Sequence, residues 1–282
     1  MTALLTLPAP AKLNLFLHIT GRRADGYHTL QTLFALLDYG DTLHFTVVDS
    51  PDIRVEPALP GVPSEQNLVY RAARLLQSAT QCGQGAEIRL EKRLPMGGGI
   101  GGGSSDAATT LLALNHLWQT GLTEDALAAL GLQLGADVPV FVRGRSAWAE
   151  GVGEIIFPAE IAENWYLVLK PACEISTRDI FSNPALTRNT SPIKLAASQT
   201  QYCKNDCESV VRQQYREVDE ALEWLDNFGK GRLTGTGSCV FLECESRENA
   251  EMLLQQSPFK GFVAKAVNES PVHRILREAL KN

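Results

Sequence analysis

The chain has no long apolar run. No stretch of its 282 residues approaches the about 20 apolar residues that a membrane-spanning helix requires. Its first ten residues also lack the basic-then-apolar order of a secretory signal peptide, and they do not resemble a plastid transit segment. These absences predict a protein of the bacterial cytoplasm with no membrane partner.

A surplus of positive charge is also missing. The sequence has 26 Lys and Arg residues against 32 Asp and Glu residues, which gives a formal net charge of -6. Nucleic acids and anionic membrane surfaces attract the opposite balance, so neither is an expected partner. An anionic small molecule is still compatible with this charge, because it needs only a local positive site. For the oligomeric state, we expect a monomer or a weak homodimer.

Paired cysteines are absent too. No C-x-x-C unit occurs, and the six cysteines are scattered over the chain. Cys203 and Cys207 are spaced so that one helix face would hold both, but no second ligand pair lies nearby, so we expect no zinc site. We predict reduced thiols, several of them buried. The six are Cys82, Cys173, Cys203, Cys207, Cys239 and Cys244.

Glycine, in contrast, is unusually dense at one place. Six of the seven residues from Gly97 to Gly103 are glycine. Glycine loses more conformational freedom on folding than any other residue and fills no core. Such a segment therefore indicates backbone that must lie close to a ligand.

An apolar helix is predicted directly after this loop, within residues 107–118. Three residues just before it are of the types preferred at a helix N-cap: Ser104, Ser105 and Asp106. Four apolar residues share one helical stripe: Leu111, Leu114, Leu117 and Trp118. A glycine loop that leads into a helix N-terminus presents converging N–H groups and the positive end of the helix dipole. The sequence therefore predicts a phosphate site.

Other interpretations of the glycine loop fit less well. A P-loop requires Gly-Lys before Ser or Thr, whereas Ser104 follows the last glycine directly. Gly97, Gly99 and Gly102 satisfy the dinucleotide pattern G-x-G-x-x-G, but so many glycines would satisfy almost any spacing. A Rossmann fold also needs a buried parallel strand before the loop, and residues 86–94 alternate as a half-exposed strand does. A flexible linker would be flanked by polar low-complexity sequence, which is absent.

For three polar residues, Lys12, Asn14 and Asp137, the sequence pattern alone favours a structural role over a functional one. Residues 11–20 alternate strictly and predict a strand, with an aliphatic row on one face and Lys12, Asn14, Phe16 and His18 on the other. The simplest interpretation of Lys12 and Asn14 is that both are solvated. Asp137 follows Gly-Ala and precedes Val-Pro, which favours the N-cap of a short helix.

The remaining pattern divides the chain into two halves. A boundary within residues 158–164 predicts domains at 1–158 and 159–282. The second half is expected to be an α+β layer of the ferredoxin-like kind, with a hairpin turn at 234–238. Residues 183–201 are expected to form an irregular surface segment. Further strands are predicted at 42–48, 53–55, 86–94, 165–170, 239–244 and 262–267, with a hairpin in 143–156. Further helices are predicted at 67–79, 124–130, 207–228 and 247–255.

Three motifs together resemble the GHMP small-molecule kinases. Residues 95–106 (Pro-Met-Gly-Gly-Gly-Ile-Gly-Gly-Gly-Ser-Ser-Asp) are similar to the phosphate-binding motif of that family. Residues 9–14 (Ala-Pro-Ala-Lys-Leu-Asn) and the Gly-Thr-Gly-Ser turn that begins at Gly235 are similar to its other two motifs. The resemblance runs from Pro8 to about Pro271. It implies an α+β fold of two domains, an N-terminal ribosomal-S5-like α/β domain and a C-terminal ferredoxin-like α+β domain.

Four further segments resemble the members of the family that act on a cytidine diphosphate-linked methylerythritol. They are residues 12–15, 23–28, 92–95 and 135–141. The resemblance implies transfer of the γ-phosphoryl group of ATP, with Mg²⁺ carried by the nucleotide, to the 2-hydroxyl of the methylerythritol moiety. This reaction belongs to the non-mevalonate route to isoprenoid precursors.

Two other hypotheses stay open. One is a GHMP kinase for another small alcohol of the homoserine or mevalonate type, which the match of residues 25–28 to a cytidine site disfavours. The other is a catalytically inactive nucleotide sensor, which the retained Lys12 and Asp137 disfavour.

The resemblance also implies roles for individual residues, and it replaces the plain interpretations given above. Lys12 and Asp137 match the catalytic pair, in which the aspartate accepts the hydroxyl proton and the lysine orients it and offsets charge. The residues implied to bind the nucleotide are Pro95, Met96, Gly97, Gly98, Gly99, Ile100, Gly101, Gly102, Gly103, Ser104, Ser105, Asn67 and Lys92. Those implied to bind the acceptor are Asn14, Thr177 and, around the cytosine, Tyr27, His28 and Phe181. No metal-ligating residue is implied.

Overall fold

The computed structural model describes residues 4–194 and 204–279. In that part of the chain no helix is both long and apolar enough to cross a membrane. The strands are β1 (Leu4–Arg22), β2 (His28–Val48), β3 (Ile53–Glu56), β4 (Gly85–Glu91), β5 (Ala147–Glu150), β6 (Ile155–Pro158), β7 (Trp165–Lys170), β8 (Arg232–Leu233), β9 (Val240–Cys244) and β10 (Lys260–Val267). The helices are α1 (Leu68–Thr80), α2 (Gly102–Leu117), α3 (Glu124–Leu132), α4 (Val138–Arg143), α5 (Thr177–Ser182), α6 (Glu208–Gln214), α7 (Arg216–Asp226), α8 (Arg247–Gln256) and α9 (Pro271–Ala279), with a 3₁₀ turn η1 (Ser64–Gln66).

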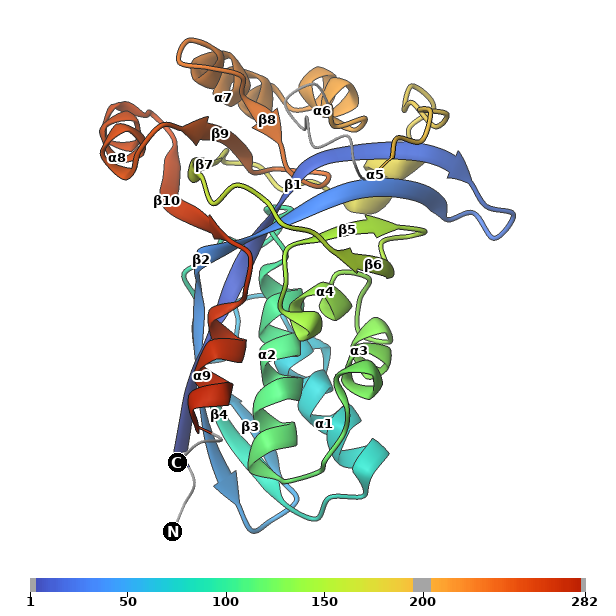
Figure 1. Ribbon diagram of the computed structural model, residues 1–282, viewed down its shortest axis with the longest axis vertical. Helices are drawn as coiled ribbons and strands as arrows, with labels where there is room; N and C mark the ends of the chain where they lie inside the picture. The colour runs from blue at the N-terminus through green and yellow to red at the C-terminus, as the bar shows by residue number, and fades with distance from the viewer. Residues whose placement is uncertain (1–3, 195–203, 280–282) are drawn as a thin grey trace.

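A long hairpin of β1 and β2 runs through the whole molecule (Figure 1). The described strands join in one sheet of order β3-β4-β2-β10-β7-β9-β8, with β1 and β5 also paired to β2, and β6 to β5. β3 runs parallel to β4, and the other described pairs are antiparallel. Helices α1 and α2 cover one face of the hairpin's lower part, whereas α7 and α8 lie with the strands of the second half (Figure 1). The hairpin is therefore the element that links the two halves.

The strand β2 is much longer than the sequence predicts. Alternation indicates a strand only at residues 42–48, but β2 begins at His28. Between Gln31 and Leu37 every residue is buried, because this part of the hairpin is covered on both faces. A strand covered on both faces loses the polar–apolar alternation that sequence analysis depends on.

Three apolar clusters make up the core. One lies between the lower part of the hairpin and helices α1, α2 and α4. A second lies among α6, α7, α8 and the strands of the second half. The third joins the halves through large side chains that include Phe16, Trp148, Tyr166, Phe241 and Phe262.

The last helix packs against the first half of the chain. Val272 of α9 is buried in the core cluster of the N-terminal half, and α9 lies against β1. The division into 1–158 and 159–282 stays a prediction. Wherever the division falls, α9 contributes to the core of the first half.

The second half follows the predicted order of elements, except that helices α5 and α9 were not predicted and one predicted helix is divided. Residues 207–228 are predicted as one helix because their apolar residues keep a helical period, but α6 and α7 are separated at Tyr215. Tyr215 has an extended backbone, and its carbonyl oxygen accepts hydrogen bonds from the N–H groups of Val218 and Asp219. The extended residue thus ends α6 and caps α7.

The segment 183–201 is described only in part. Residues 183–194 contain no helix or strand, in line with the prediction, and 195–203 lie outside the described residues.

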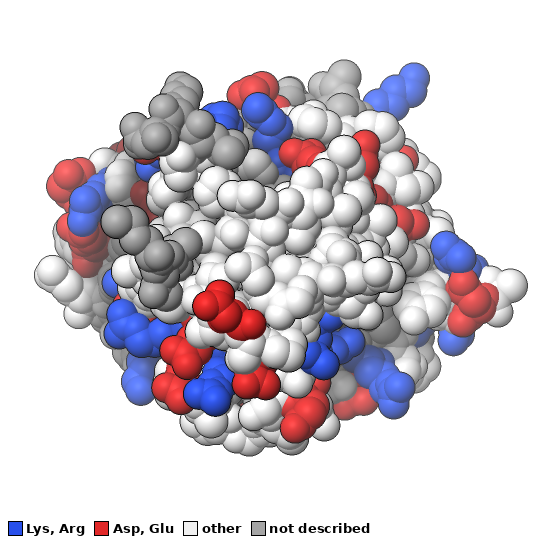
Figure 2. Space-filling model, turned by 90° about the horizontal axis from the view of Figure 1, so that it is seen from below, with Lys and Arg blue, Asp and Glu red and all other residues white. Residues whose placement is uncertain are grey.

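On the lower end of the molecule, blue and red side chains are interspersed around a broad area without charge (Figure 2). Among the described residues of that face, no extended basic patch is visible.

Candidate active site

The glycine loop takes a backbone path that only glycine can follow at several positions. Gly97, Gly99 and Gly101 have positive φ angles of 65°, 71° and 74°. A Cβ atom at Gly99 would lie 2.5 Å from the backbone oxygen of Thr234, and one at Gly101 would lie 2.7 Å from Cζ of Phe141. The prediction of constrained backbone is confirmed at these positions.

The helix after the loop begins earlier than predicted. Gly101 is the N-cap of α2, and the helix starts at Gly102, so none of the three predicted N-cap residues holds that position. Ser104, Ser105 and Asp106 lie inside the first turns of α2. Two glycines therefore form the N-terminus, where N–H groups without helical partners face outward next to the loop.

A cavity of about 400 Å³ lies against the loop and the start of α2. Both predicted flanking residues, Asn67 and Lys92, line it. The Asn67 side chain also accepts a hydrogen bond from the N–H of Val69 and so caps α1. Ser105 does not line this cavity: it is fully buried, and its Oγ has no partner among the described residues. The other predicted nucleotide residues that line the cavity are Pro95, Met96, Gly97, Gly98, Gly99, Ile100, Gly101, Gly102, Gly103 and Ser104.

Lys92 is held at this cavity by two buried carboxylates. Its Nζ lies 2.5 Å from Oδ2 of Asp41 and 2.9 Å from Oδ2 of Asp106. Burial lowers the pKa of Lys92, but the two carboxylates outweigh burial, so that the pKa is raised overall. Burial raises the pKa of Asp106 to about 7; the Asp41 carboxylate adds to this rise, and Lys92 opposes it. Asp41 also accepts hydrogen bonds from the N–H groups of Arg93 and Leu94, which fixes the start of the glycine loop.

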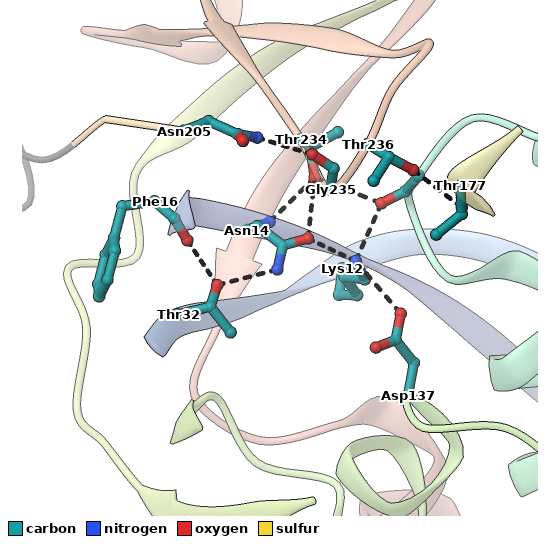
Figure 3. Close-up of polar contacts among 11 residues, drawn as sticks. Lys12, Asn14, Phe16, Thr32, Asp137, Thr177, Asn205, Thr234, Gly235 and Thr236 are labelled. Carbon is teal, nitrogen blue, oxygen red and sulfur yellow. Dashed lines mark hydrogen bonds and ion pairs between the residues drawn. The ribbon is translucent and has the colours of Figure 1, made fainter. Parts of the chain in front are cut away.

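Lys12 is buried, which contradicts the solvated interpretation. Only 3% of the residue is exposed. Its Nζ donates to Oδ1 of Asn14 at 2.5 Å and to the backbone oxygen of Gly99 at 2.9 Å, and it lies 3.4 Å from Oδ2 of Asp137 (Figure 3). The ring of Phe34 lies 5.3 Å from Nζ. The strand thus places one cation against the glycine loop and the carboxylate at once.

Asn14 is also buried, so its solvated interpretation is wrong as well. Its Nδ2 donates to Oγ1 of Thr32, which in turn donates to the backbone oxygen of Phe16. Its backbone N–H donates to Oγ1 of Thr234 at 3.0 Å. These contacts fix the amide so that its oxygen faces Lys12 (Figure 3).

Asp137 occupies the N-cap position of α4 without acting as a cap. Its backbone is helical, and its side chain makes no capping hydrogen bond. The carboxylate is directed toward Lys12 instead (Figure 3), and 34% of the side chain is exposed. A carboxylate that is paired with a cation yet open to solvent can accept a proton from a ligand.

A second cavity of about 230 Å³ contains this pair. Gly99 and Gly101 line both cavities, so the glycine loop is the wall between them. Three predicted acceptor residues line the second cavity: Asn14, Thr177 and Phe181. Sequence analysis missed Thr32 and Thr236, which line it too; the Oγ1 atoms of Thr236 and Thr177 lie 2.9 Å apart. The turn that carries Thr236 is the predicted hairpin, between β8 and β9.

Tyr27 and His28, the other two residues assigned to the acceptor, line neither cavity. The His28 ring stacks on Phe181, with 5.1 Å between ring centroids and 27° between planes. Tyr27 is 66% exposed in the turn between β1 and β2. The structure therefore brings His28 and Phe181 together and leaves Tyr27 apart.

The cysteines lie away from these contacts, except for one. In the described part of the chain, Cys207, Cys239 and Cys244 are buried free thiols and Cys82 and Cys173 are half-buried free thiols. Burial raises the pKa of Cys207 and of Cys239 to about 12. Cys239 packs beneath the loop, where a Cβ on Gly98 would lie 2.7 Å from its Sγ. Cys203 lies outside the described residues.

No group of three or more His, Cys, Asp or Glu side chains is placed to hold a metal ion within residues 4–194 and 204–279.

Comparison with known proteins gives the family. Residues 67–145 match the GHMP kinases N terminal domain, and residues 184–257 match the GHMP kinases C terminal family. A relative from Pseudomonas savastanoi pv. phaseolicola, named 4-diphosphocytidyl-2-C-methyl-D-erythritol kinase, is 59% identical over 277 residues, which are 98% of this chain and 96% of the relative. The chain belongs to the 4-diphosphocytidyl-2-C-methyl-D-erythritol kinase family. A relative of the same name from Hahella chejuensis is 56% identical over 97% of each chain.

Solved structures agree with this family. A crystal structure of 4-(cytidine 5'-diphospho)-2C-methyl-D-erythritol kinase has a TM-score of 0.83 at 32% identity, covering 93% of this chain and 99% of its own. A homoserine kinase from Cytophaga hutchinsonii has a TM-score of 0.65 at 17% identity, covering 95% of this chain and 96% of its own, and so shares the fold alone. The two-domain α+β fold of the GHMP kinases is thus confirmed for this member of the 4-diphosphocytidyl-2-C-methyl-D-erythritol kinase family.

Proposed function

We propose that this protein transfers the γ-phosphoryl group of ATP to the 2-hydroxyl of 4-diphosphocytidyl-2-C-methyl-D-erythritol, which yields the 2-phosphate and ADP. Membership of the family supports this substrate and its place in the non-mevalonate route to isoprenoid precursors. One observation carries the chemistry: Lys12 and Asp137 lie 3.4 Å apart where the two cavities share Gly99 and Gly101. A triphosphate in the first cavity and an alcohol in the second would meet at this pair.

Asp137 is proposed as the general base. As the bond from the acceptor oxygen to phosphorus forms, the hydroxyl proton passes to the Asp137 carboxylate. Phosphoryl transfer through a loose transition state depends on positioning and charge neutralisation more than on covalent help. An exposed edge on the carboxylate leaves room for the hydroxyl to approach.

Lys12 is proposed to orient the carboxylate and to offset charge on the transferring group. Because Nζ also donates to Asn14 and to the oxygen of Gly99, the ammonium is fixed relative to the loop before ATP binds. The free N–H groups of the loop and of the α2 N-terminus would hold the phosphates. A preorganised cation at this place stabilises the transition state without reorganisation.

Mg²⁺ is proposed to arrive with ATP. Magnesium is bound in such sites by substrate phosphates and water with one or two protein oxygens, rather than by a cage of protein ligands. The described residues fit this mode, because they offer no carboxylate cage and place the Ser104 side chain at the cavity. When bound, the ion would neutralise phosphate charge.

The proposal is tested by ATP consumption with a panel of phosphoryl acceptors. The panel contains the cytidine diphosphate-linked alcohol, methylerythritol phosphate without the cytidine end, homoserine and mevalonate. We expect turnover with the first acceptor and a phosphate on its 2-oxygen in the ³¹P NMR spectrum of the product. Faster turnover with homoserine or mevalonate would identify another alcohol kinase, and ATP binding without turnover on any acceptor would identify a sensor.

A further inference from the structure

One arginine outside both cavities contacts two of the three residues assigned to the cytosine. Arg188 lies in the irregular stretch after α5. Its Nε donates a hydrogen bond of 3.0 Å to Nε2 of His28, and its Nη2 donates one of 3.0 Å to the backbone oxygen of Phe181. Because His28 and Phe181 also stack on each other, one guanidinium holds both members of the pair.

The other donors of Arg188 are also occupied. Nη1 donates to the backbone oxygen of Leu186 at 3.0 Å, and Nη2 donates a second bond to the backbone oxygen of Asn183 at 2.6 Å. The planar fork of an arginine is preorganised, so these contacts hold it in one orientation. Arg188 is therefore engaged within the fold and is not a free cation awaiting the diphosphate of the substrate.

This contact decides which nitrogen of His28 carries the proton. A guanidinium in a protein is always charged and offers donors only. Nε2 of His28 must therefore accept, and the single proton of the neutral ring lies on Nδ1. Among the described residues Nδ1 has no hydrogen-bond partner, so it remains available as a donor to a ligand beside Phe181.

The surroundings also keep the ring neutral. Burial lowers the pKa of His28, and the positive charges of Arg188 and of Arg22, at the end of β1, lower it further. A neutral imidazole with Nε2 engaged has one donor and no free acceptor. Before any base binds, the ring can therefore only donate a hydrogen bond to it, through Nδ1.

We infer that Arg188 is a positioning residue that fixes His28 as a hydrogen-bond donor through Nδ1 and thereby selects cytosine over uracil. Cytosine presents an acceptor at ring nitrogen N3, whereas uracil carries a hydrogen there and would face the Nδ1 hydrogen with a second donor. The inference rests on the proposed function, since it takes His28 as the residue that meets the base. A binding site discriminates between two ligands more strongly when one of them leaves a polar group unpaired than when they differ only in size.

The first test is the protonation state of His28 in the unliganded wild-type protein, measured by ¹⁵N NMR at neutral pH. We expect a neutral ring with the proton on Nδ1, and a titration midpoint below the ordinary value of about 6.5. In Arg188→Met, which keeps the length of the side chain but has no donor, the midpoint should rise and the Nε2–H form should become populated. A wild-type ring with its proton on Nε2 would overturn the inference without any variant.

The second test is the ratio of kcat/KM for the cytidine substrate to that for its uridine analogue. We expect Arg188→Met to lower this ratio about tenfold, the size of one hydrogen bond, while the KM for ATP and kcat at saturating cytidine substrate are retained. The exposed Arg178→Met on α5 is the matched control and should change none of these values. An unchanged ratio in a folded Arg188→Met protein would overturn the inference.

A double-mutant cycle separates action through His28 from direct contact. In a His28→Ala background, Arg188→Met should lower the ratio no further. If it still does, Arg188 acts on the base directly and the inference fails. Failure of the proposed function is distinguishable, because the wild type would then not prefer the cytidine substrate, whereas the NMR measurement requires no substrate.

Discussion

At the scale of the residue, the proposed roles of Lys12 and Asp137 depend on where the fold places their charges. A lysine on a strand and an aspartate before a short helix are ordinary on their own. The structure buries the first and leaves the second without a capping bond. Asn14 and the oxygen of Gly99 fix the ammonium, so the ion pair has a defined geometry. An aspartate so placed is available for proton transfer because helix stability does not depend on it.

Asp137→Asn tests this role. Asparagine is nearly isosteric, so we expect an unchanged fold and ATP affinity, and a kcat lower by about 10²–10⁴ through loss of the base. Lys12→Met should also be slow, and the double variant should lose less than the product of the two single losses if the pair acts as a unit. Asp125→Asn, on the exposed start of α3, is the control. A kcat for Asp137→Asn within threefold of wild type would remove Asp137 from the mechanism.

Tyr27 makes a second prediction at this scale. Its ring is 66% exposed in the turn between β1 and β2 and lines neither cavity, so it contributes little to the core. If it closes over cytosine opposite Phe181, Tyr27→Ala should weaken acceptor binding by about 1–3 kcal/mol and leave the melting temperature unchanged. The measurement is KM for the cytidine substrate, with KM for ATP as the internal control. An unaltered acceptor KM would leave Phe181 and His28 as the only aromatic contacts assigned to the base.

At the scale of the element, the glycine loop separates the two cavities, and hydrogen bonds from three other parts of the chain fix its backbone. Below it, the N–H of Cys239 donates to the oxygen of Gly98, and beside it the N–H of Lys12 donates to the oxygen of Ile100. At its start, Asp41 accepts from two successive N–H groups. Strands β1 and β2 and the residue before β9 thus hold the loop in place, which explains how glycine-rich backbone can form a defined site.

Gly101→Ala and Gly102→Ala form a matched pair within this element. Gly101 has φ +74° and little space beside Phe141, whereas Gly102 is helical and a Cβ there would meet Leu94 and Lys92 at ordinary distances of 3.4 Å and beyond. We expect Gly101→Ala to lower the free energy of unfolding by about 2 kcal/mol from the left-handed backbone and the displaced ring. Gly102→Ala should be neutral or stabilising by up to about 1 kcal/mol. Denaturant unfolding without nucleotide measures both, and equal stability of the two would contradict the assigned strain.

At the scale of the whole molecule, one buried carboxylate couples folding to pH. Oδ1 of Asp106 has no hydrogen-bond partner among the described residues, although Oδ2 accepts from Lys92. Burial raises its pKa to about 7, whereas in the unfolded chain the pKa is about 4. Between these values the folded state retains a proton that the unfolded state has released. This group therefore lowers the free energy of unfolding as pH rises from about 4 to about 7, and has no further effect above that range.

Asp106→Asn removes this titration. Because the negative contribution of Asp106 is lost, we expect the slope of the variant's unfolding free energy against pH to be more positive than the wild-type slope between about pH 4 and about pH 7. Urea unfolding at half-unit steps of pH measures the slope, and the exposed Asp49→Asn should keep the wild-type slope. A variant slope equal to the wild-type slope, or more negative than it, would show that Asp106 is ionised throughout this range.

The sequence by itself determined the local features. Glycine density marked the constrained loop at residues 97–103, because glycine readily takes the positive φ angles found at Gly99 and Gly101. Most helices and strands of the second half followed from their apolar residues, including β7, whose four middle residues form a short apolar run and are all buried. The family motifs around Lys12, Tyr27 and Asp137 identified the chemistry, although the catalytic and binding roles of these residues stay predictions.

Only the tertiary structure decided how these pieces meet. Lys12, Gly99, Thr234 and Asp137 are far apart in the chain, and periodicity carries no information on contacts across such separations. The length of β2 could not be predicted because cover on both faces removed its alternation. Arg188 gave no signal either, since it lies in an irregular segment and acts through a ring 160 residues away. The physical reason is the same in each case: these roles come from burial and from pairing across the fold, and neither is a local property of the sequence.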